Sequence, residues 1–433
     1  MIEDKFCDAV EKHEVVGIGF GPANLSLAIA LREFQQVKGT SLGASSMFIE
    51  KESQFGWHSD MLIDGASMQV SFLKDLVTMR NPTSPFSFVA YLHEHGRLAD
   101  FINNAALMPY RKDFHCYLRW AADKLSDAVQ YGARVLAIEP VFREGVAETL
   151  DVKVEADGRE RILRSRNLIV GTGMSPHLPA GVKTSARVWH SSGLLARLRE
   201  LGPVGRASFV VVGAGQSSAE VVGHLHRKYP EATVHAVFSR YGYSVADDSP
   251  FVNKIFDPAA VDEFWQAPEQ VKESLLGYHA GTNYGVVDLD LSRDLYGIAY
   301  QEKLDGNPRL QVHHVSRVVR AEEAGEGVDI DIEFLPDSRV DRLRADVLIY
   351  ATGYRANDPM DVLGDLGVHC KRDDQGRLVL GRDYQVITSD ALQFGLYVHG
   401  AAAEHTHGLT ASLLSTMAVR AGEITRSIAD HVL

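Results

Sequence analysis

Two glycine-rich turns carry the first chemical signal in the sequence, because each lies between a short apolar run and a helix-like apolar spacing. The first turn contains Gly17, Gly19, Gly21 and Pro22. The second turn contains Gly213, Gly215, Gln216 and Ser217. Glycines in such a turn let a pyrophosphate approach the backbone and rest on the N-terminus of the following helix. Two such turns in one chain predict two dinucleotide sites, with a pair of purely structural corners as the alternative.

The strand that follows each turn ends in a different residue type. The first, over residues 46–50, ends in Glu50, and the second, over residues 233–240, ends in Ser239 and Arg240. A carboxylate at that position accepts hydrogen bonds from ribose hydroxyls and would repel a 2′-phosphate, whereas a guanidinium attracts one. We therefore expect FAD at the first turn and NADPH at the second.

Both turns depart from the usual dinucleotide fingerprint at its third glycine. Asn24 takes that position in the first turn and Ser218 takes it in the second. The third glycine mainly serves close packing of the helix on the strand. A small polar residue there weakens the match without excluding a dinucleotide site.

Size, charge and cysteine content narrow the class of protein. The chain has 433 residues, which is enough for two or three domains, and a net charge of −13. That charge disfavours nucleic acids and anionic membranes as partners. The cysteines, Cys7, Cys116 and Cys370, have no CxxC spacing, so neither a dithiol centre nor a zinc site is indicated. No apolar run approaches the length of a membrane span, and we expect a cytoplasmic protein.

The elements that must position the two turns form an α/β fold with two Rossmann-like dinucleotide-binding domains. Residues 134–170 alternate apolar runs with turns and read as strands, and residues 345–354 repeat the same strand-to-glycine exit. These two exits indicate where the chain leaves and re-enters the first domain. We expect an FAD-binding domain over residues 1–180 and 345–433, with an NADPH-binding domain over 181–344 inserted in it. The tail from Gly408 to Leu433 is predicted to be a helix.

Residues 57–88 carry a more specific pattern, which includes Trp57-His58, the run 68–77 and the run 80–88. Together with the two turns and residues 351–354, it resembles the N-hydroxylating flavin monooxygenases of siderophore biosynthesis, and is most similar to the L-ornithine N5-monooxygenases. Further matching segments are residues 247–253, 282–284, 407–409 and 413–415. The resemblance implies a small, mainly helical substrate-binding part at about 242–300, and a homo-oligomer, either a dimer or a tetramer.

The reaction that this resemblance implies is the NADPH- and O2-dependent hydroxylation of the side-chain amine of L-ornithine. It proceeds through a C4a-hydroperoxyflavin and gives N5-hydroxyornithine for a siderophore or hydroxamate peptide. Because the substrate nitrogen itself accepts the oxygen, no catalytic acid, base or nucleophile is required of the protein. Catalysis then rests mostly on positioning.

The resemblance also implies roles for individual residues. The substrate-binding residues are Lys74, Asn253, Asn283 and Ser415. The flavin-side residues are Trp57, His58, Gln69, Leu413 and Leu414, with Val135 touching the adenine through its backbone. Lys74 holds the substrate α-carboxylate, and the alternative is a surface lysine paired with Asp75. Asn283 serves the substrate, NADP⁺ or both.

Two local features depart from a simple assignment. Residues 410–412 read Thr-Ala-Ser where the family pattern has Ser-Asp-Thr, so the polar contacts before Leu413 differ from the usual ones. His405 and His407 have the spacing of metal ligands, but no third ligand with suitable spacing is evident. We expect them to be loop residues near the flavin and expect no metal site.

Rival readings remain open at the level of the sequence. L-lysine N6-monooxygenases and diamine N-hydroxylases belong to the same family, and residues 80–85 look more like the ornithine branch. A flavin disulfide reductase would need a cysteine pair, and a carbon- or sulfur-oxidising monooxygenase is disfavoured by residues 72–76 and the Asn253 segment. From another class, a non-catalytic NADPH-binding redox sensor is not excluded.

Overall fold

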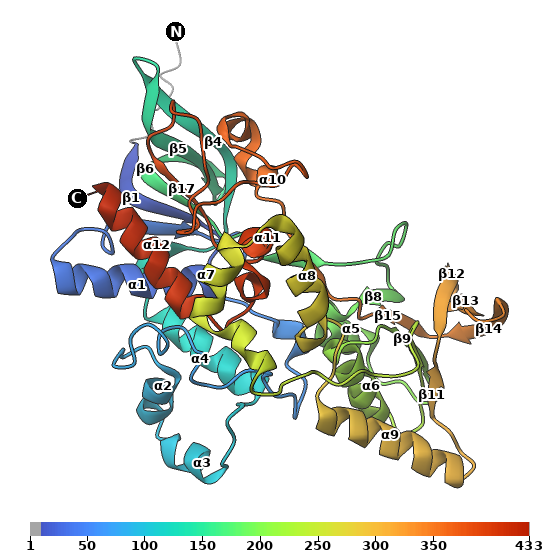
Figure 1. Cartoon of the computed structure of the whole chain (residues 1–433). Coiled ribbons are helices and arrows are strands. Elements are labelled where there is room, and N and C mark those ends of the chain that lie inside the picture. The colour runs from blue at the N-terminus through green and yellow to red at the C-terminus, as the bar shows by residue number, and fades with distance from the viewer. Residues whose placement is uncertain (1–9, 433) are drawn as a thin grey trace.

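A computed structural model describes residues 10–432, and two separate sheets form its framework (Figure 1). The first sheet has the strand order β3-β2-β1-β6-β5-β4, with β17 beside β6. Its strands are β1 (Glu11–Ile18), β2 (Ser46–Ile49), β3 (Val129–Gln130), β4 (Ala133–Arg143), β5 (Val146–Ala156), β6 (Arg159–Val170) and β17 (Gly395–Val398). The strands around β1 are parallel, whereas β4, β5 and β6 are antiparallel.

β6 connects the parallel and antiparallel halves of the first sheet. Its first part, up to Ser165, pairs with β5, and its last part, from Asn167 to Val170, pairs with β17. β17 comes from the far end of the chain. The first sheet is therefore assembled from segments that lie on both sides of the second sheet in the sequence.

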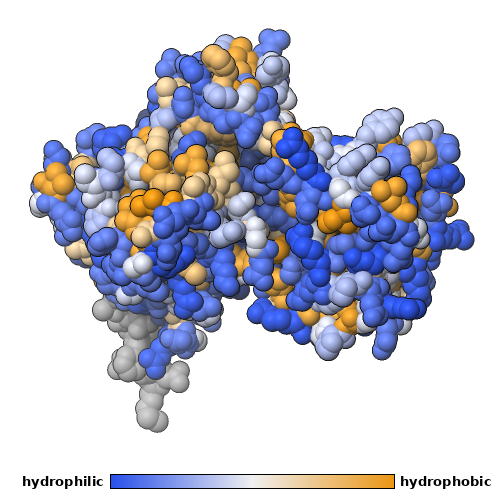
Figure 2. All heavy atoms as spheres, turned by 90° about the horizontal axis from the view of Figure 1, so that it is seen from below, coloured by the Kyte–Doolittle hydropathy of each residue, from blue (hydrophilic) through white to orange (hydrophobic). Residues whose placement is uncertain are grey.

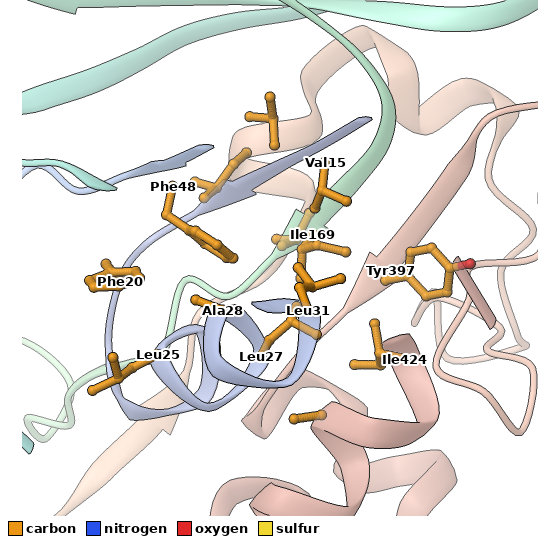
Figure 3. Packing of buried hydrophobic residues seen from close by; sticks show 14 of the residues in the cluster. Val15, Phe20, Leu25, Leu27, Ala28, Leu31, Phe48, Ile169, Tyr397 and Ile424 are labelled. Carbon is orange, nitrogen blue, oxygen red and sulfur yellow. The ribbon is translucent and has the colours of Figure 1, made fainter. Parts of the chain in front are cut away.

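Helix α1 (Pro22–Lys38) packs its buried face between the first sheet and helix α12 (Met417–Val432). Figure 3 shows Leu27 and Leu31 of α1 close to Ile169 of β6 and Ile424 of α12. The predicted helix over the whole tail is wrong for its first part. Residues Leu409–Ser412 form the short 3₁₀ helix η8, and Leu413 is extended, so α12 begins only at Met417.

The second sheet is fully parallel and has the order β11-β10-β9-β15-β8. Its strands are β8 (Val188–His190), β9 (Ser208–Val212), β10 (Thr233–Val237), β11 (Leu310–His313) and β15 (Val347–Tyr350). Its helices are α5 (Leu194–Leu201), α6 (Gln216–Lys228) and α9 (Leu289–Leu304). Each sheet contains a strand–turn–helix–strand unit, β1-α1-β2 or β9-α6-β10, so the predicted α/β class with two Rossmann-like units is confirmed.

Strand β15 shifts the expected point of return to the first domain. The sequence suggested that the return segment begins at Ala345, but β15 pairs with β9 and β8 and so belongs to the second sheet. The chain leaves that sheet after Tyr350, through β16 (Tyr354–Ala356), which pairs with β7 (Met174–Pro176). Both crossings between the sheets thus run through one two-stranded ribbon. With this strand moved, the division into domains stays a prediction.

The remaining elements surround these two sheets, and α7 and α8 lie between them in Figure 1. A three-stranded sheet consists of β12 (Ser316–Ala324), β13 (Gly327–Phe334) and β14 (Arg339–Ala345). The other helices are η1 (Ser59–Met61), α2 (Phe88–Glu94), α3 (Leu98–Asn103), α4 (Arg111–Asp123), η2 (Ser126–Ala128), η3 (Ser191–Gly193), η4 (Val252–Phe256), α7 (Pro258–Gln266), α8 (Glu269–His279), η5 (Ala280–Thr282), α10 (Met360–Leu363), η6 (Gly364–His369), η7 (Ala401–Ala403) and α11 (Glu404–His407).

The face seen in Figure 2 is hollowed between two lobes, and its most extended group of apolar side chains lies on the left lobe. Within residues 10–432, no helix has both the length and the apolar character that crossing a membrane requires.

Candidate active site

The first glycine turn has the shape that a pyrophosphate requires. Gly19 has a φ of 82°, and a Cβ there would lie 2.5 Å from the carbonyl oxygen of Gly171. Gly21 is the N-cap of α1, and no atom lies within 4 Å of the position its Cβ would take. The backbone at the start of α1 is therefore open to a ligand, and Pro22 begins the helix without needing a hydrogen-bond acceptor for an N–H.

Asn24 explains how the first turn manages without its third glycine. This buried side chain donates from Nδ2 to the carbonyl oxygens of Ile18 at 3.1 Å and Gly19 at 2.7 Å. Its Oδ1 lies 3.3 Å from Nδ1 of His399. Asn24 thus stabilises the turn from its buried side, and the exposed backbone at Gly21 remains open to a ligand. We therefore assign Asn24 a structural role in the predicted FAD site.

Glu50 follows the last residue of β2 and lies beside the same turn. Its Oε2 accepts from the backbone N–H of Phe20 at 2.8 Å, and its Oε1 accepts from the N–H of Glu52 at 3.0 Å. These two hydrogen bonds hold the Glu50 carboxylate at the turn, where a ribose would lie.

Val135 lies on β4, and the register of the β4–β5 pairing shifts between Val135 and Ala137.

The second turn repeats the design of the first. Gly213 has a φ of 145°, and a Cβ there would overlap the Ala351 carbonyl. Ser218 is fully buried and donates to the Gly213 carbonyl at 2.7 Å, as Asn24 does to Gly19. Gly215 caps α6, which begins with Gln216 and Ser217. Both substitutions of the third glycine therefore stabilise their turns.

Arg240 lies three residues beyond the end of β10 and points to the second turn. Its Nη1 donates to the carbonyl of Gly285 at 2.8 Å, and Gly285 packs against Gly215. No ion pair of Arg240 with a carboxylate occurs in the described part of the chain. The guanidinium is thus free to bind an anion near the turn, and its role at the 2′-phosphate stays a prediction.

Trp57 and His58 lie against each other, with their rings edge to face at 4.7 Å. His58 adopts a left-handed backbone conformation with a φ of 50° and also contacts the ring of Tyr354 at 5.5 Å. Burial, together with the nearby charges of Arg111 and His115, lowers the pKa of His58 to about 4. The imidazole is neutral at pH 7, and Tyr354 brings it next to the ribbon that joins the two sheets.

Gln69 is exposed, so it is not a buried structural amide. Its Nε2 donates to Oδ1 of Asp288 at 3.1 Å. Asp288 also accepts from Gln216 at the second turn, at 2.9 Å. The structure therefore brings a predicted flavin residue and a predicted NADPH residue onto the same carboxylate.

Lys74 is half-buried and reaches across to the substrate-binding part, where its Nζ lies 5.4 Å from the centre of the Phe256 ring. The alternative pairing with Asp75 is wrong. Asp75 is buried and accepts from the backbone N–H groups of Val77, Thr78 and Phe88, at 2.7–2.9 Å. Burial lowers the pKa of Lys74, and the more distant Asp257 partly offsets this shift.

The Asn253 and Ser415 segments meet around η8. Asn253 lies in η4, which packs against η8, and its Nδ2 donates to the carbonyl of Asp248 at 2.8 Å. Leu413, Leu414 and Ser415 follow η8 directly, and Ser415 is buried. Because Lys74 contacts Phe256 of the same η4, three of the four predicted substrate residues belong to one packed cluster of segments.

Asn283 joins this cluster through its neighbour Tyr284. The Tyr284 hydroxyl donates to Oε2 of Glu404 at 2.5 Å, and the Asn283 and Ser412 side chains lie beside it. Burial raises the pKa of both Tyr284 and Glu404. A cavity of about 620 Å³ borders this contact. The sequence singled out Asn283, but the contact that ties its segment to η8 is made by Tyr284.

The family model described as L-lysine 6-monooxygenase/L-ornithine 5-monooxygenase matches residues 11–356. The chain belongs to this family. The predicted family and the class of FAD- and NADPH-dependent N-hydroxylating monooxygenases are thereby confirmed.

Individual members of the family match almost the whole chain. The L-ornithine N(5)-monooxygenase of Pseudomonas aeruginosa is 36% identical over 426 residues, which cover 97% of this chain and 94% of that protein. The ornithine N-hydroxylase of Kutzneria sp. 744, solved with reduced FAD, NADP⁺ and L-ornithine, has a TM-score of 0.93 and 44% identity, covering 98% of this chain and 100% of that one. The L-lysine 6-monooxygenase of Pseudomonas syringae has a TM-score of 0.84 and 28% identity, covering 97% and 100%.

His405 and His407 lie on the short helix α11, not in a loop as expected. His405 Nε2 contacts the carbonyl of Leu378 at 2.8 Å, and His407 Nε2 contacts that of Arg382 at 3.1 Å. The His407 ring stacks on Tyr384 with centroids 3.8 Å apart. Each imidazole therefore has a structural partner, and residues 10–432 contain no cluster of three or more potential metal ligands.

Sequence reasoning missed Arg111, Glu220, Asp288 and Glu404. Arg111 and Glu220 form an ion pair with an N–O distance of 2.7 Å, although 109 residues separate them. Asp288 precedes α9 and has the local pattern of an ordinary helix cap. No local signal marks such residues, because their partners come from distant parts of the chain.

Proposed function

We propose that this member of the family hydroxylates the side-chain nitrogen of L-ornithine, using NADPH and O2. The single observation that carries the proposal is the greater similarity to the Kutzneria ornithine N-hydroxylase, at 44% identity, than to the Pseudomonas syringae lysine enzyme, at 28%. The product would be N5-hydroxyornithine, destined for a hydroxamate siderophore or peptide.

The two turns fit the two cofactors that this reaction needs. The open backbone at Gly21 and the carboxylate of Glu50 suit FAD, and the turn at Gly215 with Arg240 suits NADPH. When bound, FAD supplies the centre that takes electrons from NADPH and activates O2. Trp57, His58, Gln69 and the Leu413–Ser415 segment would border its ring, and Val135 its adenine.

Lys74 supplies the charge that would hold the amino acid. Its ammonium is half-buried and forms no ion pair within the described residues, so it has an unmet demand for an anion. A substrate α-carboxylate would meet that demand. Asn253 uses one amide hydrogen on Asp248 and keeps Oδ1 for the α-ammonium group. Held at this end, the side-chain amine would be placed by length alone.

The amine must be unprotonated to accept oxygen, because its lone pair forms the new bond. We infer no protein base for this step, since the pKa of His58, the histidine of the predicted site, is lowered to about 4, which makes its imidazole too weak a base to take a proton from an alkylammonium group. Asn283, the buried Ser415 and the Tyr284–Glu404 pair at the cavity would instead restrict the entry of water and stray protons.

An assay with a panel of amines tests the function against its alternatives. Purified protein with bound FAD should oxidise NADPH and form hydroxylamine when L-ornithine is present. L-lysine or diamines as the better substrates would move the protein to another branch of the family. Tight NADPH binding with no hydroxylamine from any amine would support the redox-sensor alternative.

We also propose that the protein works in the cytoplasm as a homo-oligomer. Cys116 is exposed and Cys370 is buried, and both are free thiols, as a reducing compartment favours. Light scattering on the purified protein would decide between a dimer, a tetramer and a monomer. Cys7 lies outside the described residues.

A further inference from the structure

Five polar side chains form a hydrogen-bonded chain between the two cofactor-binding units. In order along this chain they are Gln69, Asp288, Gln216, Glu220 and Arg111. Gln69 and Arg111 come from the segment that follows the first turn, and the other three come from the inserted unit. The two contacts that join these groups are not local, because 219 residues separate Gln69 from Asp288 and 109 separate Arg111 from Glu220.

On the side of the first unit, the two contributing residues belong to one stiff piece of backbone. The N–H of Arg111 donates to the carbonyl of Ala66, and the N–H of Met68 donates to that of Pro109, both at 2.8 Å. Ser67 and Tyr110 also form a β-bridge. Gln69 and Arg111 are therefore held at a fixed separation, and the first unit contacts the inserted unit at two linked points.

The first contact between the two units is the ion pair between Arg111 and Glu220. Nη1 and Nη2 of Arg111 donate to the two carboxylate oxygens of Glu220 at 2.7 Å, and the side chains are only 13% and 4% exposed. A buried bidentate pair of this kind restricts orientation as well as distance. Because Glu220 lies in the first turns of α6, this ion pair fixes the position of the helix that begins at the second glycine turn.

The second contact between the two units is made by Asp288, which is hydrogen-bonded to both Gln69 and Gln216. Its backbone N–H donates to Oε1 of Gln216 at 2.9 Å, and its Oδ2 accepts from Nε2 of Gln216 at 2.9 Å. Its Oδ1 accepts from Gln69 Nε2 at 3.1 Å. Gln216 Nε2 also donates to Glu220 at 3.0 Å, so this amide cannot flip without placing its oxygen against two carboxylates.

We propose that Asp288 is a positioning residue that fixes the flavin-facing amide of Gln69 relative to the NADPH turn at Gln216, and thereby aligns the two cofactors for hydride transfer. This inference rests on the proposed function, since the cofactor roles of Gln69 and Gln216 belong to it. A carboxylate is required because both of its oxygens must accept. An asparagine offers one acceptor and one donor, and would serve only one of the two glutamines.

The step that depends on this alignment is the transfer of one hydride between the two cofactors. NADPH gives a hydride, with its electron pair, to oxidised FAD, which leaves NADP⁺ and reduced FAD. Asp288 neither gains nor loses a proton in it. Its effect is confined to distance and angle, to which such transfers are sensitive.

The experiment compares Asp288→Asn with Asp290→Asn as a matched control two residues further on. The Asp290 side chain is 99% exposed, and its nearest cation, Arg293, lies 3.9 Å away. After anaerobic rapid mixing with NADPH, the limiting rate of flavin reduction in Asp288→Asn should fall by about tenfold to a hundredfold. Its FAD content and dissociation constant for NADPH should stay close to those of the wild type, and Asp290→Asn should match the wild type throughout.

Two further measurements separate positioning from a merely structural role. Hydrogen exchange of the holoenzyme should rise in residues 66–69 and 216–220 of Asp288→Asn, without a general rise elsewhere. The double variant Asp288→Asn/Gln216→Ala should reduce flavin no more slowly than Gln216→Ala alone, because both changes break the same contact.

An unchanged limiting rate in Asp288→Asn would overturn the inference, as would a loss that appears only as weaker NADPH binding or additive effects in the double variant. The failure of the proposed function looks different. In that case the wild-type protein itself would not be reduced by NADPH or would form no hydroxylamine. Normal reduction of the wild type with an equally fast Asp288→Asn variant removes only the inference.

Discussion

Lys74 carries a positive charge at a half-buried position, where partial loss of hydration makes the charged form less favourable. Burial lowers the pKa of Lys74, and Asp257 is too distant to form an ion pair with it. The ring of Phe256 gives it only a cation–π contact at 5.4 Å. A charge kept in this way favours an incoming anion, which is the basis for assigning it to the substrate carboxylate.

Replacement of Lys74 should separate substrate binding from redox chemistry. In Lys74→Ala, FAD content and NADPH-driven flavin reduction should stay near wild-type values, while hydroxylamine formation collapses and H2O2 appears instead. Lys254→Ala, which removes an exposed lysine from the same η4, is the control and should behave as wild type. Loss of FAD from Lys74→Ala would show that the residue is structural.

Arg240 should choose NADPH over NADH. A guanidinium–phosphate contact contributes roughly 1.5–3 kcal/mol, so Arg240→Ala should raise the KM for NADPH by about tenfold to a hundredfold. The KM for NADH should change much less, because NADH lacks the 2′-phosphate. Steady-state kinetics with both cofactors measures this, with Arg227→Ala, on the exposed side of α6, as the control. Equal losses with both cofactors would contradict the assignment.

Among the elements, the two strand–turn–helix units show that a departure from a motif can carry a structural purpose. Asn24 and Ser218 replace the same glycine, and each donates to the carbonyl of a glycine five residues earlier, Gly19 or Gly213, at 2.7 Å. The motif alone showed two weakened matches. The structure shows two turns held from within by a side chain that glycine lacks.

Asn24→Ala should loosen the first turn and leave the second intact. The change removes the side-chain donor to the Gly19 carbonyl and one of the two donors to the Ile18 carbonyl, which keeps the N–H of Gly171, and should lower the free energy of unfolding by about 1–3 kcal/mol. It should also weaken FAD binding, and leave NADP⁺ binding unchanged. Denaturant unfolding and fluorescence titration with FAD measure the two effects, and Asn103→Ala, at an exposed position, is the control. Unaltered FAD affinity would contradict the role of Asn24.

The elements could be predicted from the sequence where a local pattern decides them. The strands before each turn, the helices after them and the run over residues 134–170 form at the expected places. The sequence placed β15 in the first sheet, whereas it lies in the second. An apolar strand followed by glycine fits either sheet, and only the pairing of β15 with β8 and β9 decides between them. The prediction of one helix over the tail failed because the backbone leaves the helical conformation at Gly408, with a φ of 79°, and at Leu413, which is extended.

At the scale of the whole molecule, contacts between distant segments were beyond prediction. The Arg111–Glu220 pair, the Asp288 junction and the Tyr284–Glu404 contact each join residues that no local spacing relates. The candidate site residues could be named from a family pattern, but the segments that hold them could not. How the two units dock depends on such contacts.

Buried neutral histidines should make the folded protein sensitive to acid. Burial lowers the pKa of His58, His224 and His235 to about 4 and that of His407 to about 3. In the unfolded chain they bind protons near pH 6.5, so the unfolded state takes up protons first. The free energy of unfolding should therefore decrease as the pH falls from about 6.5 to 4.

His224→Gln tests this dependence, because Nε2 of His224 has no hydrogen-bond partner among the described residues. The variant should show a shallower decrease between pH 7 and pH 5, by a fraction of the roughly 1.4 kcal/mol per pH unit that a fully buried histidine gives. Urea unfolding at three pH values measures it, with His93→Gln at an exposed position as the control. An unchanged slope would contradict the account.

The central claim, that this protein is an ornithine hydroxylase, is tested most directly by coupling: the hydroxylated product formed per NADPH consumed, with L-ornithine and with L-lysine. If Lys74 anchors the α-carboxylate, the extra methylene of lysine displaces its amine by about 1.3 Å, an offset that costs on the order of a hundredfold in a positioned reaction. We predict near-stoichiometric product from ornithine, whereas lysine should stimulate NADPH oxidation and yield mainly H2O2. Equal or better coupling with lysine would contradict the claim.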